Sequence, residues 1–382
     1  MKYLRWLLFP LSFIYGLMVI MRNWFYDAGF FKSQKFDIPV ISVGNLEVGG
    51  AGKSPMTEYL IRLLKSDYKL ATLSRGYGRE TKGYLEAEPR IKSQESREEN
   101  SASSLQHLQP ATHKLQLASQ IGDEPAQFKH KFPDITVAVC EKRVEGIKRL
   151  MPDHNLIILD DAYQHRAVEP GLSILLFDYG KLGEPHFLLP AGNFREPFSG
   201  RWRAQIVVAS KCPAALSVND QGDVVQKLKP LPYQSVFLTS IAYQKLQNLD
   251  GDASDFVIDG NTTIFLLTGI ANPKPLLDHL NGLTTHLIHH NYPDHHPFTL
   301  KNITKLANEF LACASAEKII ITTEKDAQRL KQSWFKQALP NFEKPPVGVL
   351  PIQVKFLNNS GERFNQLIFD YVRQHPAFGS IH

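Results

Sequence analysis

The sequence predicts an α/β fold: a parallel sheet with helices on both faces, followed by a second, smaller α/β/α domain. Three observations lead to this expectation. Short runs of β-branched and other apolar residues recur along the chain, as in strands that a sheet buries on both faces. Segments of helical character separate these runs, an order that is typical of parallel sheets. With 382 residues, the chain is long enough for about two domains.

The first strand, at residues 40–43, leads into the glycine-rich turn of VGNLEVGGAGKSP and a helix expected from about Pro55 to Lys65. Such a turn forms a nest of backbone N–H groups for phosphate; its lysine reaches the β- and γ-phosphates and its serine can ligate Mg²⁺. We therefore predict a P-loop NTPase-like sheet, although Glu47 replaces the usual first glycine. A purely structural turn is the alternative. The predicted nucleotide-binding residues here are Gly49, Gly50, Ala51, Gly52, Lys53 and Ser54.

A second nucleotide signal is the continuously apolar run 156–159, which ends in Asp160 and Asp161. Two adjacent carboxylates repel each other unless a cation lies between them. Carboxylates at the tip of a strand are also the groups that hold Mg²⁺ beside phosphates. We therefore predict that both aspartates belong to a magnesium site.

The strand expected at residues 69–74 is followed by SRGYGR. The carboxyl ends of parallel strands face the ligand crevice, so Arg75 and Tyr77 are placed to meet phosphate or substrate. Solvated surface arginines are the alternative interpretation. Further strands are predicted at residues 134–140, 173–178 and 206–210.

The domain organisation follows from changes in composition. The first domain is expected at residues 27–212, with a flexible insertion at 86–119, a segment rich in Glu, Ser, Gln and Lys. Residues 213–260 are polar and irregular and are expected to be a linker. The second domain is predicted at 261–382, where strands and helices alternate again.

Residues 1–26 form an N-terminal segment of unusual composition, with an almost entirely apolar run at 6–21. A bilayer-spanning helix needs about 17–25 apolar residues, so the run is marginal, and Pro10 and Gly16 weaken it further. Basic and aromatic residues on both sides favour a helix at the membrane interface. A buried core helix is the alternative; a signal peptide lacks its small-residue cleavage site.

The charge balance and the spacing of the cysteines argue against a nucleic-acid-binding protein and against a cysteine-based metal or redox site. The net charge of +5 is mild and dispersed, without a basic stripe interleaved with aromatic residues, so we expect no nucleic-acid partner. The three cysteines lie far apart in no metal or redox spacing, which indicates reduced thiols of a cytosolic protein. The sequence carries no signal for the oligomeric state.

Five histidines fall within residues 286–296, but zinc would need a further acidic or cysteine ligand at defined spacing, and only Asp294 lies nearby. Solvated or capping roles are therefore expected for most of them. The loop YPDHHPF is the exception, because an aspartate beside a histidine can orient its imidazole. The five are His286, His289, His290, His295 and His296.

Seven motifs occur in order along the chain: VGNLEVGGAGKSP, SRGYGR, IGDEP, ILDDAYQHR, NFREP, YPDHHPF and TTEKDAQRL. Together they resemble the tetraacyldisaccharide 4'-kinase family, the lipid A 4'-kinases of Gram-negative bacteria, whose phosphate loop also lacks the first glycine. The resemblance implies ATP- and Mg²⁺-dependent phosphorylation of the 4'-hydroxyl of a tetraacylated glucosamine disaccharide 1-phosphate. It also implies that the enzyme acts at the cytoplasmic face of the inner membrane, where residues 1–26 help it to reach the lipid. A P-loop kinase acting on a soluble metabolite is the rival hypothesis, and a regulatory NTP-binding switch is a third.

The same resemblance assigns roles to individual residues. Asp123 of GDEP and His295, favoured over His296 by its position in the motif, match an acid–histidine pair that helps to deprotonate the sugar hydroxyl. Lys53 matches the catalytic lysine of the phosphate loop. The metal group comprises Ser54, Asp160, Asp161 and Glu196; the substrate-facing residues are Arg75, Tyr77, Arg143 and Arg195; Gln164 and His165 are expected to face the nucleotide.

Overall fold

The computed structural model describes residues 8–87, 113–342 and 346–375 of the chain. The predicted flexible insertion at 86–119 lies outside the described residues for most of its length. Its last residues, which were also expected to be irregular, belong to helix α4 (His113–Ile121).

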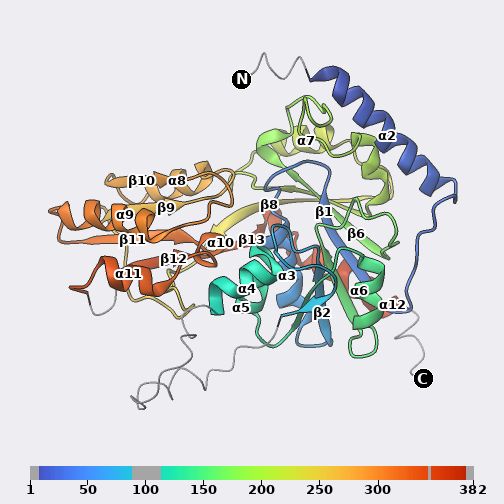
Figure 1. Ribbon diagram of the computed structural model, residues 1–382. Helices are drawn as coiled ribbons and strands as arrows, with labels where there is room; N and C mark the ends of the chain where they lie inside the picture. The colour runs from blue at the N-terminus through green and yellow to red at the C-terminus, as the bar shows by residue number, and fades with distance from the viewer. Residues whose placement is uncertain (1–7, 88–112, 343–345, 376–382) are drawn as a thin grey trace, which may run out of the picture.

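The larger of two sheets has nine strands, all parallel except the two at its edges (Figure 1). Every residue of its central strands is buried, which explains the continuous apolar runs in the sequence. In spatial order the strands are β13 (Ile352–Phe356), β8 (Ser235–Tyr243), β7 (Ile206–Ser210), β6 (Leu172–Asp178), β1 (Val40–Asn45), β5 (Leu156–Asp160), β2 (Leu70–Ser74), β4 (Thr136–Val139) and β3 (Leu85–Glu86).

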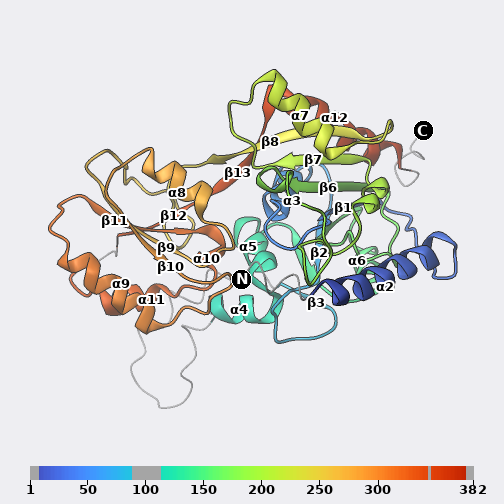
Figure 2. The same cartoon turned by 90° about the horizontal axis from the view of Figure 1, so that it is seen from above.

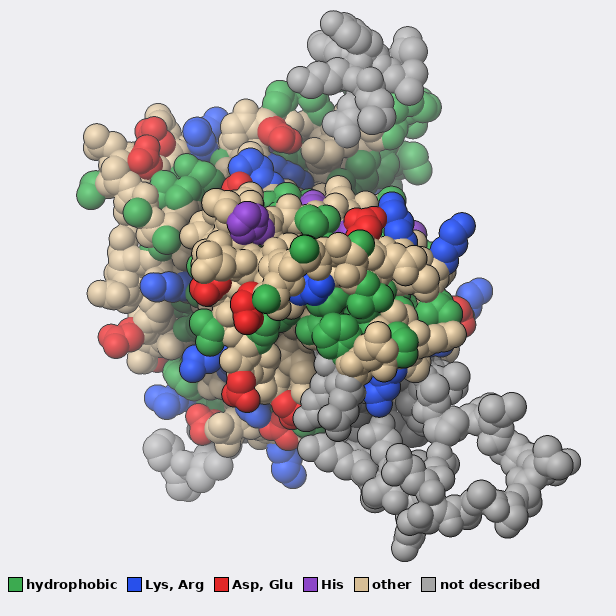
Figure 3. All heavy atoms as spheres, turned by 90° about the vertical axis from the view of Figure 1, so that its left-hand side faces the viewer, with side chains coloured by type: hydrophobic (Ala, Val, Ile, Leu, Met, Phe, Trp, Pro, Cys, Tyr) green, Lys and Arg blue, Asp and Glu red, His purple; other side chains and the backbone are tan. Residues whose placement is uncertain are grey.

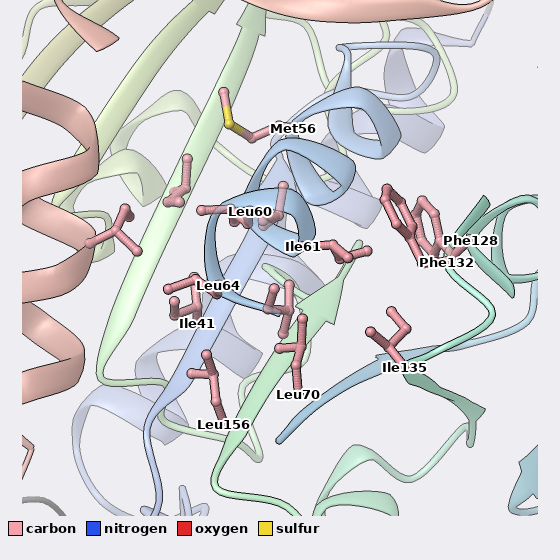
Figure 4. Close-up of a cluster of buried hydrophobic side chains, with 14 of the residues drawn as sticks. Ile41, Met56, Leu60, Ile61, Leu64, Leu70, Phe128, Phe132, Ile135 and Leu156 are labelled. Atoms are coloured by element: carbon pink, nitrogen blue, oxygen red, sulfur yellow. The ribbon is translucent and has the colours of Figure 1, made fainter. Parts of the chain in front are cut away.

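Helices cover both faces of this sheet. One face packs against α3 (Lys53–Leu64), α5 (Asp123–Lys131) and α12 (Gly361–Gln374). Figure 4 shows part of this core, in which Leu60 and Ile61 of α3 lie over the strands. On the other face lie α6 (Arg143–Leu150) and α7 (Val218–Leu228).

The smaller sheet has four parallel strands in the order β10, β9, β11, β12. Helices α9 and α11 pack on one face and α8 on the other, as the predicted α/β/α arrangement requires. On the side of the molecule drawn in Figure 3, acidic and basic side chains are interspersed and histidines reach the surface. The elements are β9 (Thr263–Thr268), α8 (Lys274–Asn281), β10 (Leu287–Asn291), α9 (Leu300–Ala312), β11 (Lys318–Thr323), α10 (Glu324–Ala327), α11 (Gln332–Ala338) and β12 (Val347–Leu350).

The predicted domain boundaries need correction. The expected linker 213–260 contains α7 and β8, and β8 extends the larger sheet by pairing in parallel with β7. At the other end of the chain, β13 and α12 return to the larger domain, where Phe364 and Ile368 enter its core. Local composition gives no sign of this return, because it depends on pairing with strands more than 100 residues away.

Helix α2 (Phe9–Asp27) lies along the outside of the larger domain (Figure 1). Its inner face is buried at Ser12, Gly16 and Val19, and a methyl group added at Gly16 would lie 2.7 Å from Leu188. Its outer face exposes large apolar side chains. Among the described helices, none combines the length and the hydropathy that crossing a bilayer requires.

Candidate active site

The phosphate loop lies between the end of β1 and the start of α3. Gly49 and Gly52 adopt left-handed φ angles of 101° and 79°, which side chains disfavour and which turn successive N–H groups toward one concave side. The loop is held from the neighbouring strand ends. Ser210 Oγ donates to the carbonyl of Ala51 at 2.8 Å, and Lys211 Nζ donates to the carbonyl of Gly50. Side chains at and just after the end of β7 therefore hold the backbone of the glycine-rich turn.

Glu47, which replaces the usual first glycine of the loop, is buried. Burial raises the pKa of its carboxyl to about 7, and Lys181 Nζ lies 3.9 Å away. The backbone of Glu47 pairs with Phe194, and Val48 N donates to the carbonyl of Asn193 at 2.8 Å. The residue therefore joins the start of the loop to the segment that carries Arg195 and Glu196.

Lys53 meets the predicted acidic strand tip. Its Nζ lies 3.2 Å from Asn45 Oδ1 and 3.5 Å from Asp161 Oδ1. Arg195 Nη1 donates to both carboxylate oxygens of Asp161, at 3.0 and 3.1 Å. Burial by itself would raise the pKa of Asp161, but Lys53 and Arg195 outweigh it and hold that pKa below its ordinary value. The structure thus brings together three predicted residues from three parts of the chain.

Asp160 lies deeper than its neighbour. Thr57 Oγ1 donates to its Oδ1 at 3.0 Å, and burial, followed by the charge of Asp161, raises its pKa to about 7. The pKa values of the two adjacent aspartates therefore shift in opposite directions, that of Asp160 upward and that of Asp161 downward. Hard oxygen donors of this kind suit Mg²⁺, which needs only one or two carboxylates when phosphates and waters complete its shell.

Glu196 is completely buried and its carboxylate is surrounded by donors. Arg203 Nη2 donates to both of its oxygens at 2.8 Å, Gln164 Nε2 to Oε1 at 2.9 Å and Asn23 Nδ2 to Oε2 at 3.2 Å. Gln164 also donates to the carbonyl of Asn45 at the end of β1. Glu196 thereby connects α2 to the loop region, and its role beside a metal stays a prediction.

A group of cationic side chains surrounds His165. Burial, followed by the charges of Arg143, Arg75 and Arg22, lowers the pKa of His165 to about 4. Arg143 is itself buried, with Nη1 donating to the carbonyl of Cys140, and burial lowers its pKa to about 10. Arg75 is exposed at the tip of β2. The group is suited to an anionic ligand, and the nucleotide-facing role of His165 stays a prediction.

Asp123 and His295 meet between the two domains. His295 Nδ1 lies 3.0 Å from Asp123 Oδ2, and the ring of Tyr77 lies 5.7 Å from the imidazole, centroid to centroid. Gly122 lets the GDEP turn approach the SRGYGR loop, because a methyl group there would lie 2.9 Å from the carbonyl of Tyr77. His295 itself adopts a left-handed φ of 58°. The acid and the histidine that the family resemblance pairs therefore lie in contact, and their catalytic role stays a prediction.

The remaining histidines have separate partners. His296 Nε2 lies 3.3 Å from Asn302 Oδ1, so His295 and not its neighbour contacts Asp123. His289 contacts Thr268, and His290 contacts Glu309. Across residues 8–87, 113–342 and 346–375, no group of three or more His, Cys, Asp or Glu side chains is arranged to hold a metal ion.

Sequence reasoning missed the residues that surround this pair. Lys325 Nζ lies 3.1 Å from His295 Nε2, and Arg329 Nε lies 3.5 Å from Asp123 Oδ2. Both belong to TTEKDAQRL, a motif to which the sequence analysis gave no role. The sequence did offer one signal for these two residues: the lysine and the arginine of the motif are four residues apart, a spacing that places two side chains on the same side of a helical turn.

A glycine-rich turn whose lysine contacts the paired aspartates, together with an acid–histidine contact on a two-domain α/β fold, is an arrangement typical of a phosphotransferase. The family model described as tetraacyldisaccharide-1-P 4'-kinase matches residues 4–372. The chain belongs to this family, as the sequence motifs indicated.

Individual relatives agree with this assignment. The chain is 42% identical over 378 residues to the tetraacyldisaccharide 4'-kinase of Phocaeicola vulgatus, covering 97% of this chain and 95% of the relative. It is 40% identical to the enzyme of the same name from Flavobacterium johnsoniae, covering 98% and 99%. Among solved structures it is similar to LpxK from Aquifex aeolicus in complex with ATP, with a TM-score of 0.69, 28% identity and coverage of 97% and 99%.

Proposed function

We propose that this protein transfers the γ-phosphoryl group of ATP to the 4'-hydroxyl of a tetraacylated glucosamine disaccharide 1-phosphate in lipid A biosynthesis. Membership of the 4'-kinase family supports the reaction, and the ATP complex of the Aquifex relative supports the donor. The observation that carries the proposal is the contact of Asp123 with His295. The charge of the adjacent Glu124 acts on Asp160, so the pair lies near the acidic strand tip of the phosphate site.

In this mechanism Asp123 accepts the proton of the sugar hydroxyl as that oxygen attacks the γ-phosphorus. An alcohol needs this help, because its pKa is far above neutral pH. The loop holds the phosphates, while Lys53 and Arg195 neutralise charge that develops on the transferred group. Two domains that meet at Asp123 and His295 also limit the access of water, which would otherwise accept the phosphoryl group.

Mg²⁺ fits the donor set beside the loop. Ser54, Asp160 and Asp161 would hold it through oxygen atoms, whereas both oxygens of the further predicted ligand, Glu196, already accept from Arg203, Gln164 and Asn23. When bound, the ion neutralises the phosphate oxygens of ATP. The paired aspartates are the observation behind this proposal: burial, followed by the charge of Asp161, raises the pKa of Asp160, and a cation between the two carboxylates would relieve their repulsion.

The cationic group around His165 is assigned to the lipid substrate. Arg75 and Arg143 supply positive charge for its phosphate, and Tyr77, which is exposed beside His295, supplies a surface for the sugar. Arg195 lies closer to the nucleotide side, because its guanidinium contacts Asp161.

We further propose that α2 rests in the cytoplasmic face of the inner membrane, where both ATP and the lipid are within reach. Burying large apolar side chains is favourable by about 1.5–3 kcal/mol each, so the exposed outer face of α2 suits the acyl region of a bilayer. Tyr15 and Asn23 on its inner face donate to Arg195 O and Glu196, which links the membrane helix to the site. The outer residues are Leu11, Phe13, Ile14, Leu17, Met18, Ile20, Met21 and Trp24.

The experiment that tests the proposal offers γ-labelled ATP and Mg²⁺ to the full chain together with the lipid A disaccharide 1-phosphate or its deacylated, soluble analogue. We expect label on the acylated disaccharide and much less on the soluble analogue. Equal labelling of both would favour the rival kinase of soluble metabolites. Hydrolysis of ATP without any labelled acceptor would favour a regulatory switch.

A further inference from the structure

Helix α10 connects the two domains beside the acid–histidine pair, and Figures 1 and 2 both show it next to α5. Its first residue, the largely buried Glu324, pairs with Lys131, which also contacts Glu58 Oε2 at 2.7 Å. Glu324 Oε2 in addition accepts from Ile352 N at 3.1 Å. Because Lys131 ends α5 and Asp123 begins it, α10 is fixed to the helix that carries Asp123, the proposed base.

The next residue, Lys325, reaches the pair itself. Its Nζ lies 3.1 Å from His295 Nε2, 3.3 Å from Glu124 Oε1 and 3.4 Å from Asp294 Oδ1. An ammonium group has three N–H donors and no acceptor, so these neighbours match its donors in number. Glu124 belongs to the larger domain and the other two to the smaller one. Lys325 therefore ties the domains together at the histidine.

This contact determines which imidazole nitrogen carries the proton. Because an ammonium group only donates, Nε2 of His295 must accept, and the single ring proton lies on Nδ1. Nδ1 is the atom 3.0 Å from Asp123 Oδ2, so the ring donates to the carboxylate there. Arg329 Nε lies 3.5 Å from the same oxygen. Within the described contacts, Oδ1 of Asp123 is left to accept a hydroxyl proton.

We infer that Lys325 is a positioning residue for the phosphoryl transfer: it holds His295 in the Nδ1–H tautomer and thereby keeps Asp123 oriented toward the acceptor hydroxyl. The inference rests on the proposed role of Asp123 as the base. Lys325 acts only through His295 in this scheme and contacts neither the sugar nor ATP. A lysine suits the position because its three donors satisfy three acceptors from two domains, whereas a methionine of similar length offers no donor.

The test begins with the histidine tautomers of the full-length protein, labelled with ¹⁵N-histidine and observed in detergent by long-range ¹H–¹⁵N correlation. The His295→Gln variant assigns the signal. We expect the Nδ1–H form of His295 in the wild-type protein and a shift toward the Nε2–H form in Lys325→Met. An Nε2–H signal in the wild-type protein would overturn the inference, whether or not the variant folds.

Kinetics supply the second readout. Misplacement of a reacting group by about 1 Å can cost about 10²-fold in rate, so we expect kcat of Lys325→Met to fall by about 10- to 100-fold while the KM for ATP stays within about twofold. Lys325→Arg, which keeps donors, should recover part of the loss. The matched control is Lys274→Met, which removes an exposed lysine paired with Asp278 in the same domain and should leave kcat unchanged.

An unchanged kcat and an unchanged tautomer in Lys325→Met would each contradict the inference, as would an equal loss in Lys274→Met. Failure of the proposed function is distinguishable from these results. If Asp123→Ala retained full turnover, Asp123 would not be the base, yet the tautomer of His295 would still report the contact with Lys325.

Discussion

The nucleotide half of the site is local in sequence, whereas its acid–base half is assembled across two domains. The phosphate loop lies within a single strand–turn–helix unit, and Ser210 at the end of β7 holds it through the carbonyl of Ala51. Asp123 and His295, by contrast, are 172 residues apart and lie in different domains: Asp123 begins α5, and His295 lies in the loop between β10 and α9. The loop can therefore keep its form when the domains move, while the acid–histidine contact cannot.

This difference gives the domain junction a function. Two connections join the domains: the segment after β8, and the single residue between β12 and β13. A change in the domain angle would separate Asp123 from His295 without disturbing the loop, so ATP can bind before the acid–base half is complete. Variants in the two halves should accordingly differ in which kinetic constant they change.

The largest effect is expected in the nucleotide half. Lys53→Ala removes the ammonium group that contacts Asp161 and that we propose neutralises the phosphates of ATP, and loss of one such electrostatic group typically lowers kcat by about 10²–10³-fold. We also expect weaker ATP binding, measured by the KM for ATP. Lys65→Ala is the matched control, because Lys65 directly follows the same helix and its ammonium group pairs with the exposed Asp134. Comparable losses in both variants would contradict the role of Lys53.

Substitutions in the acid–base half of the site should lower kcat and leave the KM for ATP unchanged. Asp123→Ala removes the proposed base, and general-base catalysis typically contributes about 10²–10⁴-fold, so kcat should fall by about 10²-fold or more with an unchanged KM for ATP. Steady-state assays with varied ATP measure both constants. Asp278→Ala, on the surface of the smaller domain, should match the wild-type protein. Near-normal turnover of Asp123→Ala would remove Asp123 from the mechanism.

The exposed apolar face of α2, which we propose contacts the membrane, provides a third test because its side chains belong to neither half of the site. Phe13 and Leu17 are 75% and 59% exposed, and changing both to serine should weaken binding to anionic vesicles by about tenfold or more. Turnover of detergent-dispersed lipid should change far less. Val257→Ser, which alters an apolar residue that is 80% exposed in the segment after β8, serves as the control. Vesicle binding that stays at the wild-type level would exclude this face as the membrane contact.

The smallest effect concerns stability. Burial lowers the pKa of His165 in the folded protein to about 4, from an ordinary value of 6.5. Between these values the unfolded chain binds a proton that the folded protein does not, so the imidazole makes the protein less stable as the pH falls from 6.5 toward 4. His165→Asn should therefore lose less stability than the wild-type protein over this range. Urea unfolding at both ends of the range measures the difference, and the exposed His286→Asn should behave like the wild-type protein.

Much of the nucleotide half could be predicted from sequence, because its signals are local. The strand at 206–210 and the position of Lys53 at the start of a helix follow from short apolar runs and one glycine-rich turn. The pairing of Asp123 with His295 followed only from the family resemblance, since no spacing connects them. Lys325 was missed because its helix has four residues and its partners come from the loop before α9 and from the start of α5. Long-range contacts of this kind leave no periodic pattern in the chain.

The measurement that tests the central claim most directly is a double-mutant cycle across the domain junction. It compares the kcat of Asp123→Ala, His295→Gln and the double variant under saturating ATP and lipid. If the two residues act as one unit, the double variant should be no slower than Asp123→Ala alone. Losses that multiply would show that the two residues act independently and would contradict an acid–base group assembled from both domains.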